Sequence, residues 1–274
     1  MFLRPLQNSQ RVINPLVRKY SISASSLSGK TALVTGGSGG IGLVIAKKLA
    51  ANGARVILLA RDETKLNGAL EELTHTLKDE QTQRDITQTA HSTISYDIAK
   101  ATTPPEIDFK MVDLLVNCAG VTQTSLLMTT KNIDQIIGTN LAGAIKMSQY
   151  AMRPWMKRKS GCIVNISSVL GLRGLTGGST VYSAAKAGLV GFTKALAVEV
   201  GARGIRVNCV CPGLVETEMT QNVTVQNGFA TPLQGMGKDN YVSADSVADA
   251  VLYLAASEEQ TGSILTIDKG LSAV

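Results

Sequence analysis

The stretch TALVTGGSGGIGLVIAKKLAANG, residues 31–53, decides the fold class of this chain. It places a glycine-rich turn between an apolar run typical of a strand and a segment with helical spacing. Without side chains there, the backbone can approach a pyrophosphate closely, and the N-terminus of the following helix offers free N–H groups to it. The turn TGGSGGIG (35–42) therefore predicts a dinucleotide site, with a tight turn that holds no ligand as the alternative. Its candidate contacts are Gly36, Ser38, Gly40, Ile41 and Gly42.

Apolar runs and helical segments alternate along the rest of the chain. Further strands are expected at 54–61, 92–97, 113–120, 161–168, 205–213 and 263–268, and helices at 41–53, 63–78, 133–157, 182–202 and 244–256. Pro104 and Pro105 break residues 98–112, so a loop or a single turn is expected there, and the polar residues 79–91 suggest a surface insertion. The pattern predicts an α/β fold: a single-domain, Rossmann-type, doubly wound parallel sheet of about seven strands with helices on both faces.

The composition suits one globular domain. Among 274 residues, 26 are glycine, seven are proline and 44% are hydrophobic, and no apolar run is long enough for a membrane span. The four cysteines lack metal-site spacing, so no metal site is expected. Cys209 and Cys211 stand two apart in a strand pattern, and we expect them to share one face of the sheet as buried, reduced thiols.

Much of the net charge of +6 belongs to the first twenty residues. Basic residues stand there at four positions, no acidic residue precedes Asp62, and Arg18-Lys19-Tyr20 resembles a mitochondrial processing site. We expect residues 1–20 to be a cleaved mitochondrial presequence, 21–29 a linker and 30–274 the catalytic domain, located in the mitochondrial matrix. An unstructured tail is the alternative. Because most of the positive net charge lies in this expected presequence, it gives little support to nucleic-acid binding.

A second motif, YSAAK (182–186), carries the candidate chemistry. Tyr182 and Lys186 are four residues apart, so on a helix their side chains are neighbours. A lysine ammonium stabilises the phenolate of a neighbouring tyrosine, which makes such a phenol a proton donor near neutral pH. Ser168, at the end of a predicted strand, can donate a hydrogen bond to a carbonyl oxygen as negative charge develops on it. Asn140 can hold a water that relays protons to Lys186.

The end of the second predicted strand bears on cofactor choice. A site for NAD usually places an acidic residue there, but this chain has Ala60 followed by Arg61. A guanidinium suits a 2′-phosphate, so the sequence predicts NADPH, with an ordinary surface arginine as the alternative. Asp97 and Asn117, each at the end of a further strand, are candidates for the adenosine side, although either can instead cap a turn.

From about residue 30 to its end the chain resembles the short-chain dehydrogenase/reductase family. TGGSGGIG, NCAG (117–120), YSAAK and a PG pair (212–213) follow the family's order. The resemblance implies a catalytic tetrad of Asn140, Ser168, Tyr182 and Lys186. It also implies a tetramer formed through the helices at 133–157 and 182–202. NADPH-dependent relatives often carry arginine where this chain has Gly39, so the cofactor prediction depends on Arg61. The cofactor contacts implied by the resemblance include Ala119, Gly120, Tyr182, Lys186, Pro212, Gly213, Val215 and Thr217.

Longer strings narrow the substrate. VTQTSLLM (121–128), SSVLGLRGLTG (167–177) and CPGLVETEMT (211–220) look like those of 3-oxoacyl-[acyl-carrier-protein] reductases. That resemblance implies NADPH-dependent reduction of 3-oxoacyl-[acyl-carrier-protein] in fatty-acid synthesis. Lys159 and Arg203 match residues that bind the acidic carrier protein beside the active-site entrance, and the loop at 214–241 is expected to cover the substrate. A general carbonyl, quinone or hydroxysteroid oxidoreductase is the alternative, followed by a non-catalytic dinucleotide-binding subunit.

Overall fold

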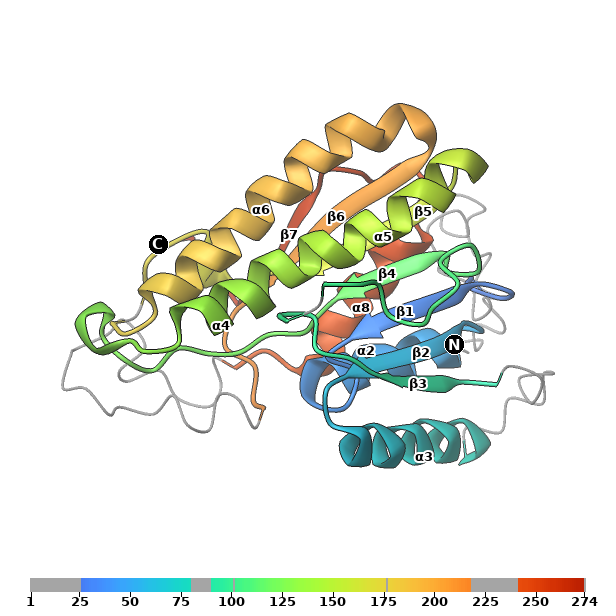
Figure 1. Cartoon of the computed structure of the whole chain (residues 1–274), viewed down its shortest axis with the longest axis horizontal. Helices are drawn as coiled ribbons and strands as arrows, with labels where there is room; N and C mark the ends of the chain where they lie inside the picture. Colours follow the sequence, from blue (N-terminus) through green and yellow to red (C-terminus); the bar gives the residue numbers. More distant parts are fainter. Residues whose placement is uncertain (1–25, 80–89, 101, 176, 218–240, 274) are drawn as a thin grey trace, which may run out of the picture.

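A computed structural model describes residues 26–79, 90–100, 102–175, 177–217 and 241–273. Its centre is a parallel sheet of seven strands in the order β3-β2-β1-β4-β5-β6-β7 (Figure 1). This confirms the doubly wound fold predicted from the alternation of strands and helices. The strands are β1 (Thr31–Thr35), β2 (Arg55–Ala60), β3 (Ser92–Ser95), β4 (Leu114–Asn117), β5 (Gly161–Ile166), β6 (Ile205–Pro212) and β7 (Ile264–Ile267).

Helices cover both faces of this sheet (Figure 1). One face carries α2 (Gly40–Ala51), α3 (Glu63–Asp79) and α8 (Ala244–Ala256), and the other carries α4 (Ile133–Ile137), α5 (Gly143–Arg158) and α6 (Thr180–Val200). Short helical turns are η2 (Leu127–Thr129), η3 (Gly138–Ala142), η4 (Val169–Gly171) and η5 (Gly201–Arg203). No described helix is both long and apolar enough to cross a membrane.

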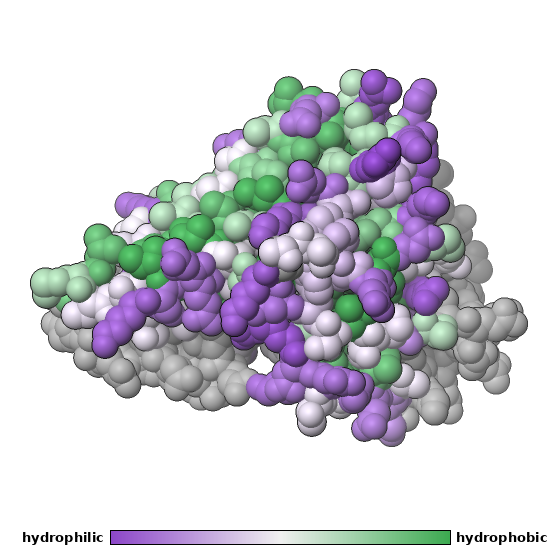
Figure 2. All heavy atoms as spheres, viewed as in Figure 1, coloured by the Kyte–Doolittle hydropathy of each residue, from purple (hydrophilic) through white to green (hydrophobic). Residues whose placement is uncertain are grey.

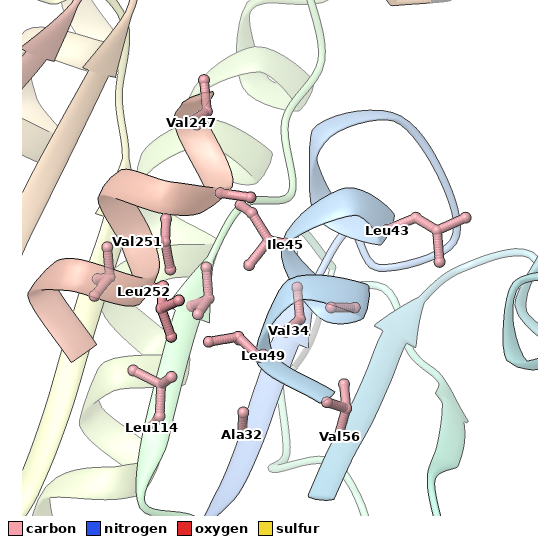
Figure 3. Close-up of a cluster of buried hydrophobic side chains, with 14 of the residues drawn as sticks. Ala32, Val34, Leu43, Ile45, Leu49, Val56, Leu114, Val247, Val251 and Leu252 are labelled. Carbon is pink, nitrogen blue, oxygen red and sulfur yellow. The ribbon is translucent and has the colours of Figure 1, made fainter. Parts of the chain in front are cut away.

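Two apolar layers hold the helices to the sheet. In the first, Ile45 and Leu49 of α2 meet Val251 of α8 over β1 and β4 (Figure 3). In the second, Trp155 of α5 is fully buried and its indole N–H donates to the Val112 carbonyl over 2.7 Å. Complete burial of such side chains stabilises the fold by about 1.5–3 kcal/mol each, before the cost in conformational entropy. These two packed layers therefore hold the strands, and the loops at their carboxyl ends, in fixed positions.

The structure divides the long helix that the sequence predicted at 133–157. Residues Gly138–Ala142 adopt a π-helical turn between α4 and α5, and Asn140 lies in its middle. Such turns insert one residue into a helix and recur at functional sites. The residues before and after the π turn are both helical, so the sequence pattern predicts one continuous helix and does not reveal the turn.

The structure describes nearly all of the predicted irregular region at 98–112 but only the ends of the predicted insertion at 79–91. Residues 98–112 contain no helix or strand among those described, as predicted, and their Ile98, Phe109 and Val112 side chains are buried in the second apolar layer. The predicted insertion at 79–91 lies largely outside the described residues. So do the predicted presequence and most of the loop at 214–241, although Val215 and Val242 at its two ends form a β-bridge.

The strand order locates the site. From β1 the chain proceeds to β2 and β3 on one side and then returns to β4 on the other. At this reversal the loops after β1 and β4 diverge and leave a crevice at the carboxyl ends of the strands, where open α/β sheets bind their ligands.

Candidate active site

A cleft of about 660 Å³ occupies this carboxyl edge of the sheet. It is lined by the glycine turn after β1, the ends of β2 and β4, the start of α6 and the residues after β6. Most of the predicted site residues meet here, from regions of sequence far apart. The predicted residues that line it are Gly36, Ser38, Gly40, Ile41, Gly42, Arg61, Asp97, Ala119, Gly120, Ser168, Tyr182, Lys186, Pro212, Gly213, Val215 and Thr217.

The glycine turn fits a pyrophosphate because it leaves no room for side chains. A Cβ on Gly36 would lie 2.8 Å from the Cα of Ala119, and one on Gly42 would lie 2.2 Å from the Gly36 carbonyl oxygen. Gly36 and Gly40 also have φ angles of 70° and 52°, which favour glycine. No acidic residue occupies the first turn of α2, so its N-terminus presents N–H groups and a positive dipole end to the cleft.

Tyr182 and Lys186 lie together on the first turns of α6, as the spacing predicted. The Lys186 Nζ is 5.6 Å from the centroid of the Tyr182 ring. Lys186 is only 4% exposed, and its ammonium donates to the Ile166 carbonyl over 2.8 Å. The Ser167 hydroxyl donates to the Lys186 carbonyl over 2.8 Å, which fixes the helix against the end of β5. The lysine is therefore held beside the phenol by contacts on both its side chain and its backbone.

Ser168 follows β5 and lines the cleft with Tyr182 and Lys186. Its Oγ accepts a hydrogen bond from the Leu170 N–H over 3.2 Å, which leaves the hydroxyl proton free to point elsewhere. A carbonyl oxygen in the cleft can therefore receive hydrogen bonds from a serine hydroxyl and a tyrosine hydroxyl. This is an arrangement for transferring a proton to an oxygen while stabilising its charge.

Asn140 is not among the residues that line the cleft, and its role in holding a water for Lys186 stays a prediction. Its side-chain amide is 1% exposed; Nδ2 donates to the Val121 carbonyl over 2.9 Å, and Oδ1 accepts from the Val121 N–H over 3.0 Å. A Cβ on Gly120 would lie 2.8 Å from this Oδ1 and 3.8 Å from the Lys186 Nζ. The side chain of Asn140 thus fastens the loop after β4 next to Lys186.

Asn117 also departs from its predicted place on the adenosine side. The side chain is buried, and its Nδ2 donates to Asn165 Oδ1 over 2.8 Å and to Ser148 Oγ over 3.2 Å. Because its amide bonds to groups of β5 and α5, it links these elements within the core. The side chain therefore does not line the cofactor cleft.

The part of the cleft lined by Arg61 contains a further basic residue that was not predicted from the sequence. Lys65 lines the cleft together with Arg61 and Asp97. Asp62 begins α3 by accepting the Lys65 N–H over 3.0 Å, which places the Lys65 side chain one turn inside the helix. Two basic side chains and a helix N-terminus thus converge on one corner. Lys65 could have been identified from the sequence, because it stands three residues after Asp62, an aspartate at the start of a predicted helix.

The cysteines match their expected state. Cys209 and Cys211 are buried on one face of β6 with their sulfur atoms 3.9 Å apart, and all four cysteines are free. Cys118 lines the cleft, where burial raises the pKa of its thiol to about 11 against a smaller opposing effect of the Lys186 charge.

In the described part of the chain, no group of three or more His, Cys, Asp or Glu side chains could hold a metal ion.

The predicted carrier-protein residues lie away from the cleft of their own chain. Lys159 lies two residues before β5 and Arg203 two residues before β6, so both stand at the amino edge of the sheet. Ser168 and Gly213 follow the opposite ends of these strands. The six residues of β5 alone separate the two edges by roughly 20 Å. Lys159 and Arg203 lie close to each other in the fold. Gly204, the residue after Arg203, packs so tightly against Lys159 that a Cβ on it would lie 2.6 Å from the Lys159 carbonyl oxygen. Within a single chain they therefore do not flank the entrance of the cleft, and their role in docking the carrier protein stays a prediction.

Comparisons with known proteins show the family of this chain. The family model described as short chain dehydrogenase matches residues 30–228. The chain is 40% identical over 253 residues to the 3-oxoacyl-[acyl-carrier-protein] reductase FabG of Escherichia coli, covering 91% of this chain and 100% of that protein. It is 38% identical over 253 residues to the protein of the same name from Chlamydia trachomatis, covering 90% and 98%.

Among solved structures, a putative 2-deoxy-D-gluconate 3-dehydrogenase from Agrobacterium tumefaciens with bound NADP superimposes with a TM-score of 0.76 at 28% identity, covering 92% of this chain and 100% of that one. The seven-stranded parallel sheet agrees with this structural likeness. The chain therefore belongs to the short-chain dehydrogenase family and is an NAD(P)-dependent oxidoreductase that acts on a carbonyl or hydroxyl group.

Proposed function

We propose that this chain uses NADPH to reduce 3-oxoacyl-[acyl-carrier-protein] to 3-hydroxyacyl-[acyl-carrier-protein] in the mitochondrial matrix. The proposal depends on one observation: Ser168, Tyr182 and Lys186 line the same cleft as the glycine turn. Support for the substrate comes from near-complete coverage of relatives named as 3-oxoacyl-[acyl-carrier-protein] reductases at 38–40% identity. An intact set of proton-donating groups argues against a subunit that only binds the dinucleotide.

The residues at the cleft fit NADPH. The turn at Gly36–Gly42 can hold the pyrophosphate, and the strand that would end in an acidic residue in a site for NAD ends instead at Ala60. Arg61 and Lys65 can bind the 2′-phosphate, with the guanidinium giving bidentate geometry. A structural relative with bound NADP supports the same preference.

The mechanism assigns a role to each side chain around the substrate oxygen. When bound, NADPH supplies the hydride that reduces the ketone carbon. The Tyr182 hydroxyl donates its proton to the ketone oxygen, and the Ser168 hydroxyl donates a hydrogen bond that stabilises the negative charge on that oxygen. The Lys186 ammonium stabilises the resulting phenolate, and its bond to the Ile166 carbonyl keeps it in place. Asn140 acts indirectly by holding the loop beside Lys186.

Docking of the carrier protein calls for a second copy of the chain. We propose that Lys159 and Arg203 bind the acidic carrier protein, and from the amino edge they can serve only the cleft of a neighbouring subunit. α5 ends at Arg158, next to Lys159, and α6 carries Tyr182 of the cleft in its first turn and ends at Val200, shortly before Arg203. The two helices run in the same direction along one face of the sheet (Figure 1). Antiparallel packing of two copies along these helices would therefore bring Lys159 of one copy toward the cleft of the other.

The surface of α5 and α6 supports such an assembly. Apolar side chains gather along this side of the molecule (Figure 2), and Val198 is 85% and Ile145 37% exposed. Exposed apolar surface of this kind marks interaction sites. We propose a homo- or hetero-tetramer built through these helices.

The experiment that tests the substrate class is a comparison of ketones. Purified protein, with and without residues 1–20, is assayed for NADPH oxidation with acetoacetyl-carrier protein, acetoacetyl-coenzyme A, a 3-ketosteroid and a quinone. The proposal expects the carrier-protein thioester to have the highest kcat/KM. A steroid or quinone reduced faster would favour the general carbonyl oxidoreductase. The matrix location is tested separately by import of the full chain into isolated mitochondria, with removal of the first twenty residues as the control.

A further inference from the structure

Gln123 is a buried polar side chain that the mechanism above does not use. It lies in the loop that follows β4, residues 121–130, and is 5% exposed. A side-chain amide in that environment must find hydrogen-bond partners, since burying it unpaired loses its hydrogen bonds to water without replacing them. Its partners come from two segments that are far apart in sequence, and one of these segments carries Tyr182.

The oxygen of this amide caps the helix that carries the catalytic pair. Gln123 Oε1 accepts the N–H of Val181 over 2.8 Å and the N–H of Tyr182 over 3.0 Å. These N–H groups belong to the first turn of α6, which has no carbonyl partners within the helix. Ser179, at the N-cap position, makes no capping bond with its side chain. A residue 58 positions earlier in the sequence thus performs the capping.

The nitrogen of the same amide holds the loop. Gln123 Nε2 donates to the Ser125 carbonyl over 2.9 Å and to the Thr130 Oγ1 over 3.0 Å, and makes a longer contact of 3.5 Å with the Thr180 Oγ1 at the start of α6. The orientation of the amide follows from its partners: a flipped side chain would place its NH₂ against two N–H donors and its oxygen against the Ser125 carbonyl. Val121 and Thr122 of this loop line the cleft, so one side chain connects the cleft wall to the start of α6.

We propose that Gln123 is a positioning residue, which fixes the backbone of Tyr182 by capping α6 and ties that position to the loop beside the substrate. The proposal rests on the proposed function, because the phenol of Tyr182 is the group it places. The bond acts on the N–H of Tyr182 itself, so losing it frees the residue whose hydroxyl must reach the ketone oxygen. A misplacement of about 1 Å at such a group can reduce turnover by roughly a hundredfold.

The test uses three substitutions chosen to separate the two halves of the amide. Gln123→Met keeps the length of the side chain and removes both polar atoms. Gln123→Glu keeps an oxygen acceptor for the two N–H groups of α6. Thr130→Val removes one partner on the loop side and leaves the bonds to α6 in place. Asn208→Leu is the matched control, because Asn208 is also a fully buried amide joining two segments, through Gln260 and Ser263, at a place outside the cleft lining.

Two measurements are made on each full-length variant: steady-state kinetics with acetoacetyl-carrier protein, and hydrogen exchange at the amides of Val181 and Tyr182. Gln123→Met is expected to lower kcat by about 10- to 100-fold, with the KM for NADPH within about twofold, and to speed exchange at both amides. Gln123→Glu keeps the acceptor for both N–H groups but sets its second oxygen against the Ser125 carbonyl, so exchange at both amides should be slower than in Gln123→Met but faster than in wild type. Thr130→Val should raise the KM for the thioester and leave kcat and both exchange rates near wild type.

The proposal is overturned if Gln123→Met leaves kcat and both exchange rates unchanged, or if Asn208→Leu lowers kcat as much. The exchange measurement requires no substrate. If wild-type protein fails to reduce any 3-oxoacyl thioester, the proposed function fails while the capping by Gln123 is still decided by exchange at Val181 and Tyr182.

Discussion

Tyr182 is the residue on which the proposed chemistry depends. Replacing it with phenylalanine removes only the hydroxyl, and the ring can keep its place beside Lys186. Since a positioned proton donor contributes about 10²–10⁴-fold, we expect kcat to fall by that factor while the affinity for NADPH stays within about twofold. Steady-state kinetics and fluorescence titration of NADPH provide the two numbers. Tyr253→Phe on the exposed side of α8 is the control. Full activity of Tyr182→Phe would contradict the assigned role.

Arg61 is the residue expected to choose between the cofactors. Arg61→Glu replaces a phosphate ligand with a carboxylate that repels the 2′-phosphate and can accept from a ribose hydroxyl. Losing a charged hydrogen bond of about 1.5–3 kcal/mol corresponds to roughly a 10- to 100-fold loss in kcat/KM for NADPH, with NADH less affected. The ratio of the two kcat/KM values measures the effect. Lys110→Glu makes the same charge change at an exposed site on the amino edge and should leave the ratio unaltered.

At the scale of elements, the turn after β7 supports the cofactor loop. A Cβ on Gly213 would lie 3.0 Å from the Cα of Asp268, so this turn packs under the Pro212–Gly213 pair. The Asp268 carboxylate accepts the N–H of Gly270 over 3.0 Å and both the N–H and the hydroxyl of Ser272. Burial opposes ionisation, but these hydrogen bonds outweigh it and lower the pKa of Asp268. The ionised carboxylate therefore contributes stability.

The sign of that contribution sets its pH dependence. Because the pKa is lower in the folded protein, the contribution is complete above the unfolded value of about 3.9 and is lost as the pH falls through the folded value below it. Asp268→Asn should reduce the free energy of unfolding at pH 7 by about 1.5–3 kcal/mol, with a smaller effect toward pH 3. Urea unfolding across this range measures the difference. A loss that does not depend on pH would show that the charge is irrelevant.

The elements also show how far sequence reasoning reaches. The glycine turn and the Tyr182–Lys186 pair could be predicted because their geometry is local, set by a few consecutive residues and a helical repeat. Asn117 ends β4 and Asn140 lies in η3, and their side chains bond to Asn165 and to Val121. Those partners are set by tertiary packing that no local pattern encodes. The π turn, the capping by Gln123 and the place of Lys159 at the far edge escaped prediction for the same reason.

At the scale of the whole molecule, the assembly can be tested at one exposed position. Val198 lies on α6 and is 85% exposed, so a charge there disturbs the single chain little. In the proposed tetramer it would be buried, where an unpaired carboxylate is costly. Val198→Glu should therefore shift the mass measured by light scattering toward dimer or monomer, with an unchanged far-UV circular dichroism spectrum. The control is Glu71→Gln on exposed α3. A tetramer that persists in Val198→Glu would place the interface elsewhere.

The proposed activity is tested most directly by the steady-state rate of dinucleotide oxidation with acetoacetyl-carrier protein, measured with NADPH and with NADH on the same preparation. We expect carrier-dependent oxidation with a kcat/KM at least about tenfold higher for NADPH, since each 1.4 kcal/mol of added binding to the 2′-phosphate is worth a factor of ten. The product should be the 3-hydroxyacyl thioester. No oxidation of either dinucleotide with this substrate, or a clear preference for NADH, would contradict it.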